Sequence, residues 1–145
     1  MLKFKIPGHP VGKARPRFVA NRNGKGGRAY STETTINYEA LVKSVASKAL
    51  EQNPVFPPNK AYHVTMQIDL AVPASWSKKR KAMALNGLIC PTTKPDIDNV
   101  EKIIFDGLNG IVWNDDKQVV DVTKNKRYAE MPSVFVSIEV VGEAA

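Results

Sequence analysis

The chain has 145 residues, of which 43% are hydrophobic and 24% charged, a composition typical of a globular domain and not of a disordered chain. The single cysteine, Cys90, excludes an internal disulfide, and no apolar stretch reaches the length of a membrane span. A length of 145 residues predicts one domain over residues 1–145. The first residues also lack the apolar run of a signal peptide, so we expect the protein in the cytoplasm.

The charges are unevenly distributed along the chain. The formal net charge is +7, which favours a polyanionic partner. Residues 1–32 contain eight Lys and Arg and no acid, whereas residues 96–121 contain seven of the fourteen Asp and Glu. The basic arm suits contacts with phosphates, while the acidic cluster can face phosphates only if a cation lies among its carboxylates.

The first third of the chain predicts a strand, a loop, a hairpin and a helix. Residues 2–6 alternate like a strand, and the prolines and glycines of residues 7–16 indicate an irregular loop. The glycine-rich residues 18–30 predict a hairpin or a flexible loop, with Phe18 and Tyr30 packed in the hairpin or the core. Ser31 is the expected N-cap of a helix that ends near residue 51. Its predicted inward face consists of Ile36, Ala40, Leu41, Val45 and Ala49.

The remaining chain alternates between strand and helix patterns. Residues 62–72 alternate apolar and polar residues, and residues 118–128 and 133–141 predict two further strands. Ser77 caps a predicted short helix over residues 78–86. A longer helix is expected from about Asp98, with Val100, Ile103, Ile104, Gly107 and Leu108 facing inward. This order predicts an α+β fold with a mixed or antiparallel sheet, covered on one face by helices.

The segment from Lys94 to Lys102 carries the candidate chemistry. Pro95 disfavours a helical conformation for Lys94, so the chain is expected to enter Asp96 extended. In an extended stretch Asp96 and Asp98 lie on one face, and Asp98 suits a helix N-cap. Lys102 follows one helical turn after Asp98 and lies over the same face.

A second pair of carboxylates, Asp115 and Asp116, precedes the strand predicted from residue 118. Converging carboxylates repel each other unless a divalent cation lies between them, and Mg²⁺ prefers such hard oxygen ligands. A metal held there can activate water and neutralise a phosphodiester, with Lys102 adding a fixed positive charge. Taken singly, each residue also fits a structural role, as an N-cap, a turn residue or a solvated lysine.

Three segments together resemble the signature of the RusA family, and the opening Gly8–Arg17 is also similar to that family. The segments are Lys94-Pro95-Asp96-Ile97-Asp98-Asn99-Val100-Glu101-Lys102, Phe105-Asp106-Gly107-Leu108-Asn109-Gly110 and Asp115-Asp116-Lys117-Gln118-Val119-Val120. The resemblance covers residues 2 to about 141, and its most specific part is 94–122.

The resemblance implies a homodimeric Holliday-junction endonuclease that uses magnesium, or manganese in its place, in DNA recombination and repair, in a phage-related setting. The family's catalytic and metal-binding carboxylates correspond to Asp96, Asp98 and Asp116, and its catalytic lysine to Lys102. The spacing between Gly110 and the acidic pair leaves the choice between Asp115 and Asp116 open.

Basic residues in the first 30 positions are the expected contacts to DNA phosphates. They are Lys13, Arg15, Arg17, Arg22, Lys25 and Arg28. A solvated hairpin is the competing interpretation of the last three. The run Lys78–Lys81 fits a second phosphate contact or a solvated helix face, and Trp76 fits either base stacking or packing under that helix.

The predicted function is therefore paired, metal-dependent cutting of four-way DNA junctions. The two-fold symmetry of such a junction matches the symmetry of a homodimer. Two other functions are compatible with parts of the sequence. One is a non-catalytic nucleic-acid-binding protein, which has no use for carboxylates facing phosphates. The other is a metal-dependent nuclease that acts on other branched DNA.

Overall fold

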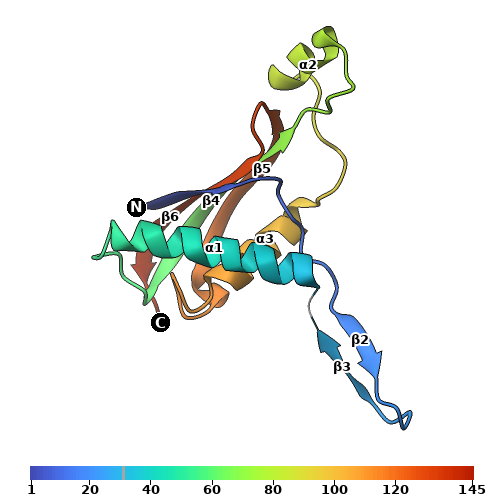
Figure 1. The fold of residues 1–145 in the computed structure, drawn as a ribbon. Helices are drawn as coiled ribbons and strands as arrows, with labels where there is room; N and C mark the ends of the chain where they lie inside the picture. The colour runs from blue at the N-terminus through green and yellow to red at the C-terminus, as the bar shows by residue number, and fades with distance from the viewer. Residues whose placement is uncertain (31) are drawn as a thin grey trace.

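The computed structural model describes residues 1–30 and 32–145, with Tyr30 described by its backbone alone. A four-stranded sheet has the order β1-β6-β4-β5, in which β4 and β5 are parallel and the other neighbours antiparallel. The strands are β1 (Leu2–Pro7), β4 (Lys60–Ala71), β5 (Val119–Ala129) and β6 (Ser133–Glu143). The helices α1 (Glu33–Glu51) and α3 (Ile97–Leu108) cover one face of this sheet (Figure 1). The predicted α+β fold with a mixed sheet is confirmed.

The core lies between that sheet face and the two helices. On β4 the inward residues are Tyr62, Val64, Met66 and Ile68, each at most 1% exposed. The predicted inward face of α3 is confirmed, since Val100, Ile103, Ile104, Gly107 and Leu108 are all buried. Burial of each large aliphatic side chain contributes roughly 1.5–3 kcal/mol, so α3 is firmly held against the sheet. No helix among the described residues is long and apolar enough to cross a membrane.

Helix α1 presents a different face to the core from the one predicted. The buried residues are Thr35, Tyr38, Val42 and Ala46, whereas Ile36 is 55% exposed and Ala40 is also exposed. A Cβ on Gly107 of α3 would lie 2.9 Å from Cγ1 of Val42, so the missing side chain lets Val42 pack closely against α3. This long-range contact sets the rotation of α1, and Leu41, Val45 and Ala49 pack partly buried beside it.

The N-terminal cap of α1 is Thr32, whose Oγ1 accepts a hydrogen bond from the backbone N of Thr35 (3.3 Å). The predicted cap, Ser31, lies outside the described residues.

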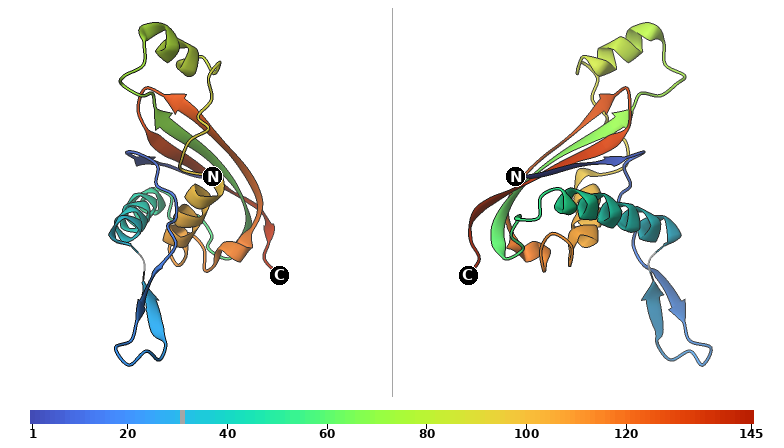
Figure 2. Two further views of the ribbon diagram at one scale, coloured as in Figure 1. Left: turned by 90° about the vertical axis from the view of Figure 1, so that its right-hand side faces the viewer. Right: turned by 60° about the vertical axis from the view of Figure 1, so that its left-hand side comes forward.

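Two segments project from opposite ends of the molecule (Figures 1 and 2). One is the hairpin of β2 (Arg17–Ala20) and β3 (Gly27–Tyr30), which confirms the hairpin prediction. The other is α2 (Lys78–Leu85), capped as predicted by Ser77, whose Oγ accepts a hydrogen bond from the backbone N of Arg80. The start of α3, which carries Asp96, lies between the two projections (Figure 1).

Candidate active site

Asp96 and Asp98 both lie at the start of α3, but in a different local structure from the one predicted. The helix begins at Ile97, so Asp96 is its N-cap and Asp98 lies in its first turn. The backbone at Asp96 is extended and Ile97 packs against the core, both as predicted, but the helix starts at Ile97, so the predicted extended stretch through Asp98 is wrong. The Asp96 side chain makes no capping hydrogen bond, and Oδ1 of Asp98 accepts one from the backbone N of Asn99 (3.0 Å). Asp96 thus keeps its carboxylate free of the helix end.

Two lysines of β5 fix the start of α3. The ammonium of Lys126 donates hydrogen bonds to the carbonyl oxygens of Thr93 (2.7 Å) and Pro95 (3.2 Å). Nζ of Lys124 lies 3.2 Å from Oε1 of Glu101. Sequence reasoning did not single out these lysines, although their i, i+2 spacing in a predicted strand places both on one face. They show that β5 and α3 run antiparallel.

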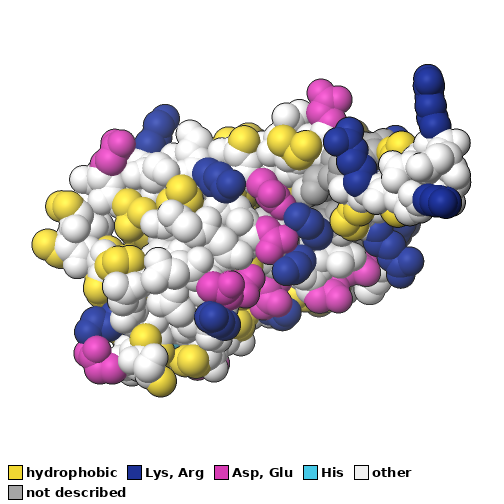
Figure 3. Space-filling view, turned by 90° about the horizontal axis from the view of Figure 1, so that it is seen from below, with side chains coloured by type: hydrophobic (Ala, Val, Ile, Leu, Met, Phe, Trp, Pro, Cys, Tyr) yellow, Lys and Arg dark blue, Asp and Glu magenta, His cyan; other side chains and the backbone are white. Residues whose placement is uncertain are grey.

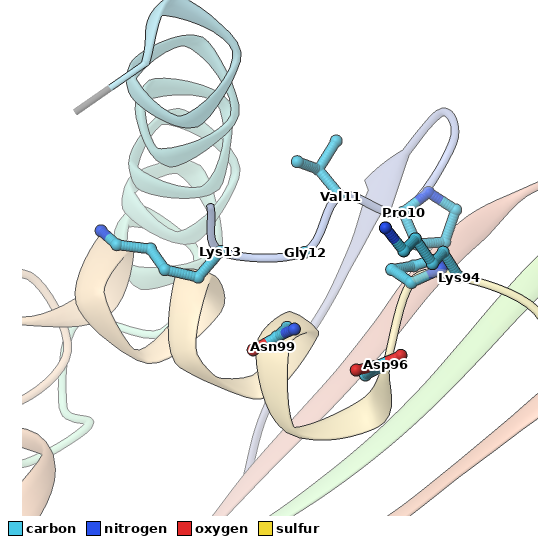
Figure 4. Close-up of a pocket in the computed structure, with 8 residues that line it drawn as sticks. Pro10, Val11, Gly12, Lys13, Lys94, Asp96 and Asn99 are labelled. Atoms are coloured by element: carbon cyan, nitrogen blue, oxygen red, sulfur yellow. The ribbon is translucent and has the colours of Figure 1, made fainter. Parts of the chain in front are cut away.

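The loop after β1, residues 8–16, packs beside the start of α3. The backbone N of Lys13 donates to the carbonyl oxygen of Asn99 (2.9 Å). A Cβ on Gly12 would lie 3.2 Å from Cβ of Asn99, so this close approach suits glycine. Between the loop and α3 lies a cavity of about 430 Å³ (Figure 4), lined by Pro10, Val11, Gly12, Lys13, Lys94, Pro95, Asp96 and Asn99.

Lys13 reaches away from Asp96 (Figure 4) and forms ion pairs inside the protein. Its ammonium lies 2.5 Å from Glu39 on α1 and 3.1 Å from Asp106 on α3. Burial lowers the pKa of Lys13, but hydrogen bonds and charge interactions with both carboxylates outweigh it and raise the pKa above its ordinary value. Because its charge is already compensated by these two carboxylates, the geometry supports a structural role for Lys13, and the predicted phosphate contact stays a prediction.

Lys102 projects from α3 one turn after Asp98. Its side chain is 60% exposed, and its ammonium lies 3.1 Å from Oδ1 of Asp106, four residues further along the helix. An exposed i, i+4 pair of this kind stabilises a helix by only about 0.3–0.5 kcal/mol. The ammonium can therefore leave Asp106 at little cost.

The two acids of the second segment have different surroundings. Asp115 is the N-cap of the short helix η1 (Asp116–Gln118), where its Oδ1 accepts a hydrogen bond from the backbone N of Lys117 (2.9 Å). Gln118 completes a capping box with Asp115. No hydrogen bond or ion pair involves the carboxylate of Asp116 in the part of the chain that the structure describes. Asp116 is thus the freer of the two carboxylates to bind a ligand.

Asp116 does not join Asp96 and Asp98 within one chain. It lies near the C-terminal end of α3, because η1 immediately precedes β5, which runs antiparallel to that helix. The twelve residues of α3 separate its two ends by about 18 Å. Within residues 1–30 and 32–145, no three acidic, His or Cys side chains come close enough to share a metal ion. The expectation that the three carboxylates converge is therefore wrong for a single chain.

The remaining predicted DNA contacts lie on the exposed surface of the loop and the hairpin. They are Arg15, Arg17, Arg22, Lys25 and Arg28. Figure 3 shows Lys and Arg side chains at the right-hand end of one face, over the hairpin, and Asp and Glu side chains gathered toward its middle. Phe18 is 67% exposed and so does not pack in the core, but its ring lies against Gly27 of β3, where a Cβ would come 2.6 Å from Cζ of Phe18, so the predicted packing in the hairpin is confirmed. The side chain of Tyr30 lies outside the description.

Comparison with known proteins agrees with the resemblance seen in the motifs. The family model of endodeoxyribonuclease RusA matches residues 7–139. The chain is also 38% identical over 144 residues to the uncharacterized protein YqaN of Bacillus subtilis (strain 168), a match that covers 97% of this chain and 96% of YqaN. The matched region includes the basic loop, the hairpin, α2 and both acidic segments. The chain belongs to the RusA family of endodeoxyribonucleases.

Proposed function

We propose that the protein resolves Holliday junctions by paired, metal-dependent hydrolysis of phosphodiester bonds in DNA recombination and repair. The observation that carries this proposal is the free carboxylate of Asp96 at the start of α3, beside a cavity and two residues before Asp98 in the chain. A helix N-cap aspartate ordinarily accepts a backbone hydrogen bond, so a carboxylate left out of the cap is available to an external ligand. Membership of the RusA family supports a nuclease reaction.

Asp96 and Asp98 fit a magnesium ion by their chemistry. They are hard oxygen donors, two carboxylates are the number that Mg²⁺ commonly takes, and the cavity leaves room for water and a substrate phosphate. When bound, the metal would supply charge neutralisation and an activated water. Lys102, released from Asp106, would approach the phosphoryl oxygens from the next helical turn. Manganese has the same preference for oxygen ligands and is expected to substitute.

A homodimer accounts for Asp116, which is far from Asp96 in its own chain. We place Asp116 of a second copy near Asp96 and Asp98 of the first, which would give two composite sites related by the dimer axis. Two such sites match the two-fold symmetry of a four-way junction. The carboxylate of Asp116 makes no hydrogen bond or ion pair with a described residue, whereas that of Asp115 caps η1, and this difference supports the assignment of Asp116.

Mixed dimers test the composite site. Asp96→Asn and Asp116→Asn chains are each expected to be inactive, but one mixed dimer retains a single intact site if the carboxylates come from different chains. Co-refolding the two variants should then restore single nicks without paired cuts. If both carboxylates act within one chain, no mixed dimer has an intact site, and the mixture should stay inactive.

Substrate comparison separates this proposal from its two rivals. Cutting of a four-way junction, a flap and a linear duplex is compared at equal salt, because affinity for DNA depends strongly on salt. Preference for the junction supports the proposal. Equal or better cutting of the flap would indicate a nuclease for other branched DNA. Tight junction binding without any cutting in magnesium or manganese would indicate a non-catalytic binding protein.

A further inference from the structure

The charges of the chain divide between two projecting arms and the body. The hairpin arm (residues 14–30) contains five Lys and Arg, and the α2 arm (residues 71–95) also contains five. Neither arm contains an Asp or Glu. The rest of the chain holds eleven Lys and Arg against all fourteen acids, so the body is net acidic and the arms carry a large share of the positive charge. The two arms leave the body at opposite ends (Figures 1 and 2).

The lysines of α2 are not explained by the stability of the helix. The run Lys78–Lys81 fills its first turn, where the helix dipole favours acids, and no acid is present there. Neighbouring positive charges also repel one another. None of the four cations forms an ion pair with a described residue. Such an arrangement is unfavourable in the free protein and becomes favourable only against an anionic surface.

The α2 arm is held in a fixed orientation by aromatic packing. The guanidinium of Arg80 lies 4.0 Å from the ring centre of Trp76, and Trp76 packs edge-on against Tyr128 at the end of β5 (5.4 Å between centroids). Ala84, four residues after Arg80, is 1% exposed. Trp76 is therefore committed to packing under the helix, and not to stacking on a base.

Two lysines point away from this packed side. Lys78 and Lys79 precede the buried Ala84 by six and five residues, so at about 100° per residue they lie on the opposite side of α2. Both are exposed. The α2 arm thus presents two free ammonium groups on a helix that is anchored to the sheet.

The α2 arm is also continuous with the candidate active site. Its last residues, which include the exposed Lys94, lead directly into Asp96. The ammonium of Lys126 lies beside the same segment, through its hydrogen bonds to Thr93 and Pro95. A polyanion that leaves the site toward α2 would therefore meet positive charge and no carboxylate from the arm.

We propose that the α2 arm is a second DNA-binding surface, which contacts the phosphates of a duplex on the side of Asp96 opposite to the hairpin. Lys78 and Lys79 are the contacting residues, and Trp76 and Arg80 are positioning residues that brace the helix. This inference rests on the proposed action on DNA. In this arrangement the two arms hold DNA on both sides of the cutting site, so that the bond to be cut lies over Asp96.

The test measures binding of a labelled four-way junction in EDTA, between about 50 and 200 mM salt, where each phosphate contact contributes roughly one unit to the slope of log affinity against log salt. The K78Q/K79Q variant should lose about two units of slope and roughly tenfold in affinity at intermediate salt. The matched control, K43Q/K48Q, removes two exposed lysines from α1 and should bind like the wild type. Equal binding by both variants would overturn the proposal.

Charge reversal separates binding from folding. K78E/K79E places acids in the first turn of α2, where they favour the helix, so its melting temperature should be no lower than that of the wild type. Its affinity for the junction should nevertheless fall below that of K78Q/K79Q. A lower melting temperature together with weaker binding would assign these lysines to folding and contradict the proposal.

Failure of the proposed nuclease function and failure of the proposed α2 surface give different results. If the wild type cuts no DNA in magnesium or manganese but K78Q/K79Q still loses salt slope, the reaction is wrong and the binding surface stands. If the wild type cuts the junction and K78Q/K79Q binds like K43Q/K48Q, the reaction stands and the α2 surface is wrong.

Discussion

The ammonium of Lys126 donates a hydrogen bond to the carbonyl oxygen of Pro95 (3.2 Å), the residue immediately before Asp96. We expect this contact to position Asp96, because a misplacement of about 1 Å in a catalytic site can cost a hundredfold in rate. Lys126→Met should lower the rate of junction cutting at saturating protein about tenfold or more, whereas its effect on junction affinity in EDTA should not exceed that of losing a single phosphate contact. Lys126→Arg keeps a donor and should restore most of the rate. If the Lys126→Met variant cuts the junction as fast as the wild type, Lys126 does not position Asp96.

Asp98→Asn is expected to abolish cutting and leave junction binding intact or stronger. The substitution removes a metal ligand and also one negative charge that repels phosphates. Cutting is measured in magnesium, and binding is measured separately in EDTA. Asp115→Asn is the matched control, because Asp115 serves as a helix cap and should retain cutting. Weaker binding by a folded Asp98→Asn protein would count against the assigned role.

Substitutions of Arg15 and Lys13 should have different effects on DNA binding and on stability, although the two residues are only two positions apart. Arg15 is exposed, so Arg15→Ala should weaken DNA binding and reduce the salt slope by about one unit. Lys13→Ala should leave the slope unchanged and lower the free energy of unfolding by about 1 kcal/mol, because Glu39 and Asp106 lose their cation. Salt titration and urea denaturation measure the two effects. A fall in slope for Lys13→Ala would restore Lys13 as a phosphate contact.

Tyr38→Phe should stabilise the protein. The Tyr38 hydroxyl is buried and has no hydrogen-bond partner among the described residues, so its removal should raise the free energy of unfolding by about 1 kcal/mol. Tyr62→Phe is the control, because the Tyr62 hydroxyl donates to the carbonyl oxygen of Pro57 and its loss should destabilise. Guanidinium denaturation of both variants at neutral pH gives the comparison. A less stable Tyr38→Phe protein would show that the hydroxyl has a partner.

The same tyrosine predicts a dependence on pH. Burial raises the pKa of Tyr38 above its ordinary value of 10.0, so the unfolded chain loses this proton at a lower pH than the folded protein does. The associated stability is fully present below pH 10.0 and is lost as the pH rises above that value. The stability advantage of Tyr38→Phe over the wild type should therefore widen above pH 10. A constant difference across this range would contradict the buried, neutral hydroxyl.

Local patterns were sufficient to predict most elements of the fold. The alternation along β4 and the apolar spacing of α3 each report one buried face, and both predictions are confirmed. The face of α1 could not be read in this way, because its rotation depends on the contact between Val42 and Gly107, which lie 65 positions apart. The start of α3 was predicted one residue too late, although the extended backbone predicted at Asp96 is present, because both Asp96 and Asp98 are residue types that suit an N-cap.

The candidate site shows the same division between local and long-range information. Motif spacing identified Asp96, the N-cap of α3, and also Asp98 and Lys102, which lie one helical turn apart on α3. It could not show that Asp116 lies near the other end of that helix, or that Lys13 is paired with Glu39 and Asp106, because both depend on how distant segments pack.

Cleavage of a labelled, mobile four-way junction, beside a linear duplex of the same sequence, tests the central claim most directly. The reactions contain the wild-type protein with magnesium or with EDTA. The account predicts paired, symmetric nicks on the junction alone, and loss of those nicks in EDTA. Tight binding of the junction without cutting in magnesium or manganese would contradict it, and Asp96, Asp98 and Asp116 would then have only structural roles.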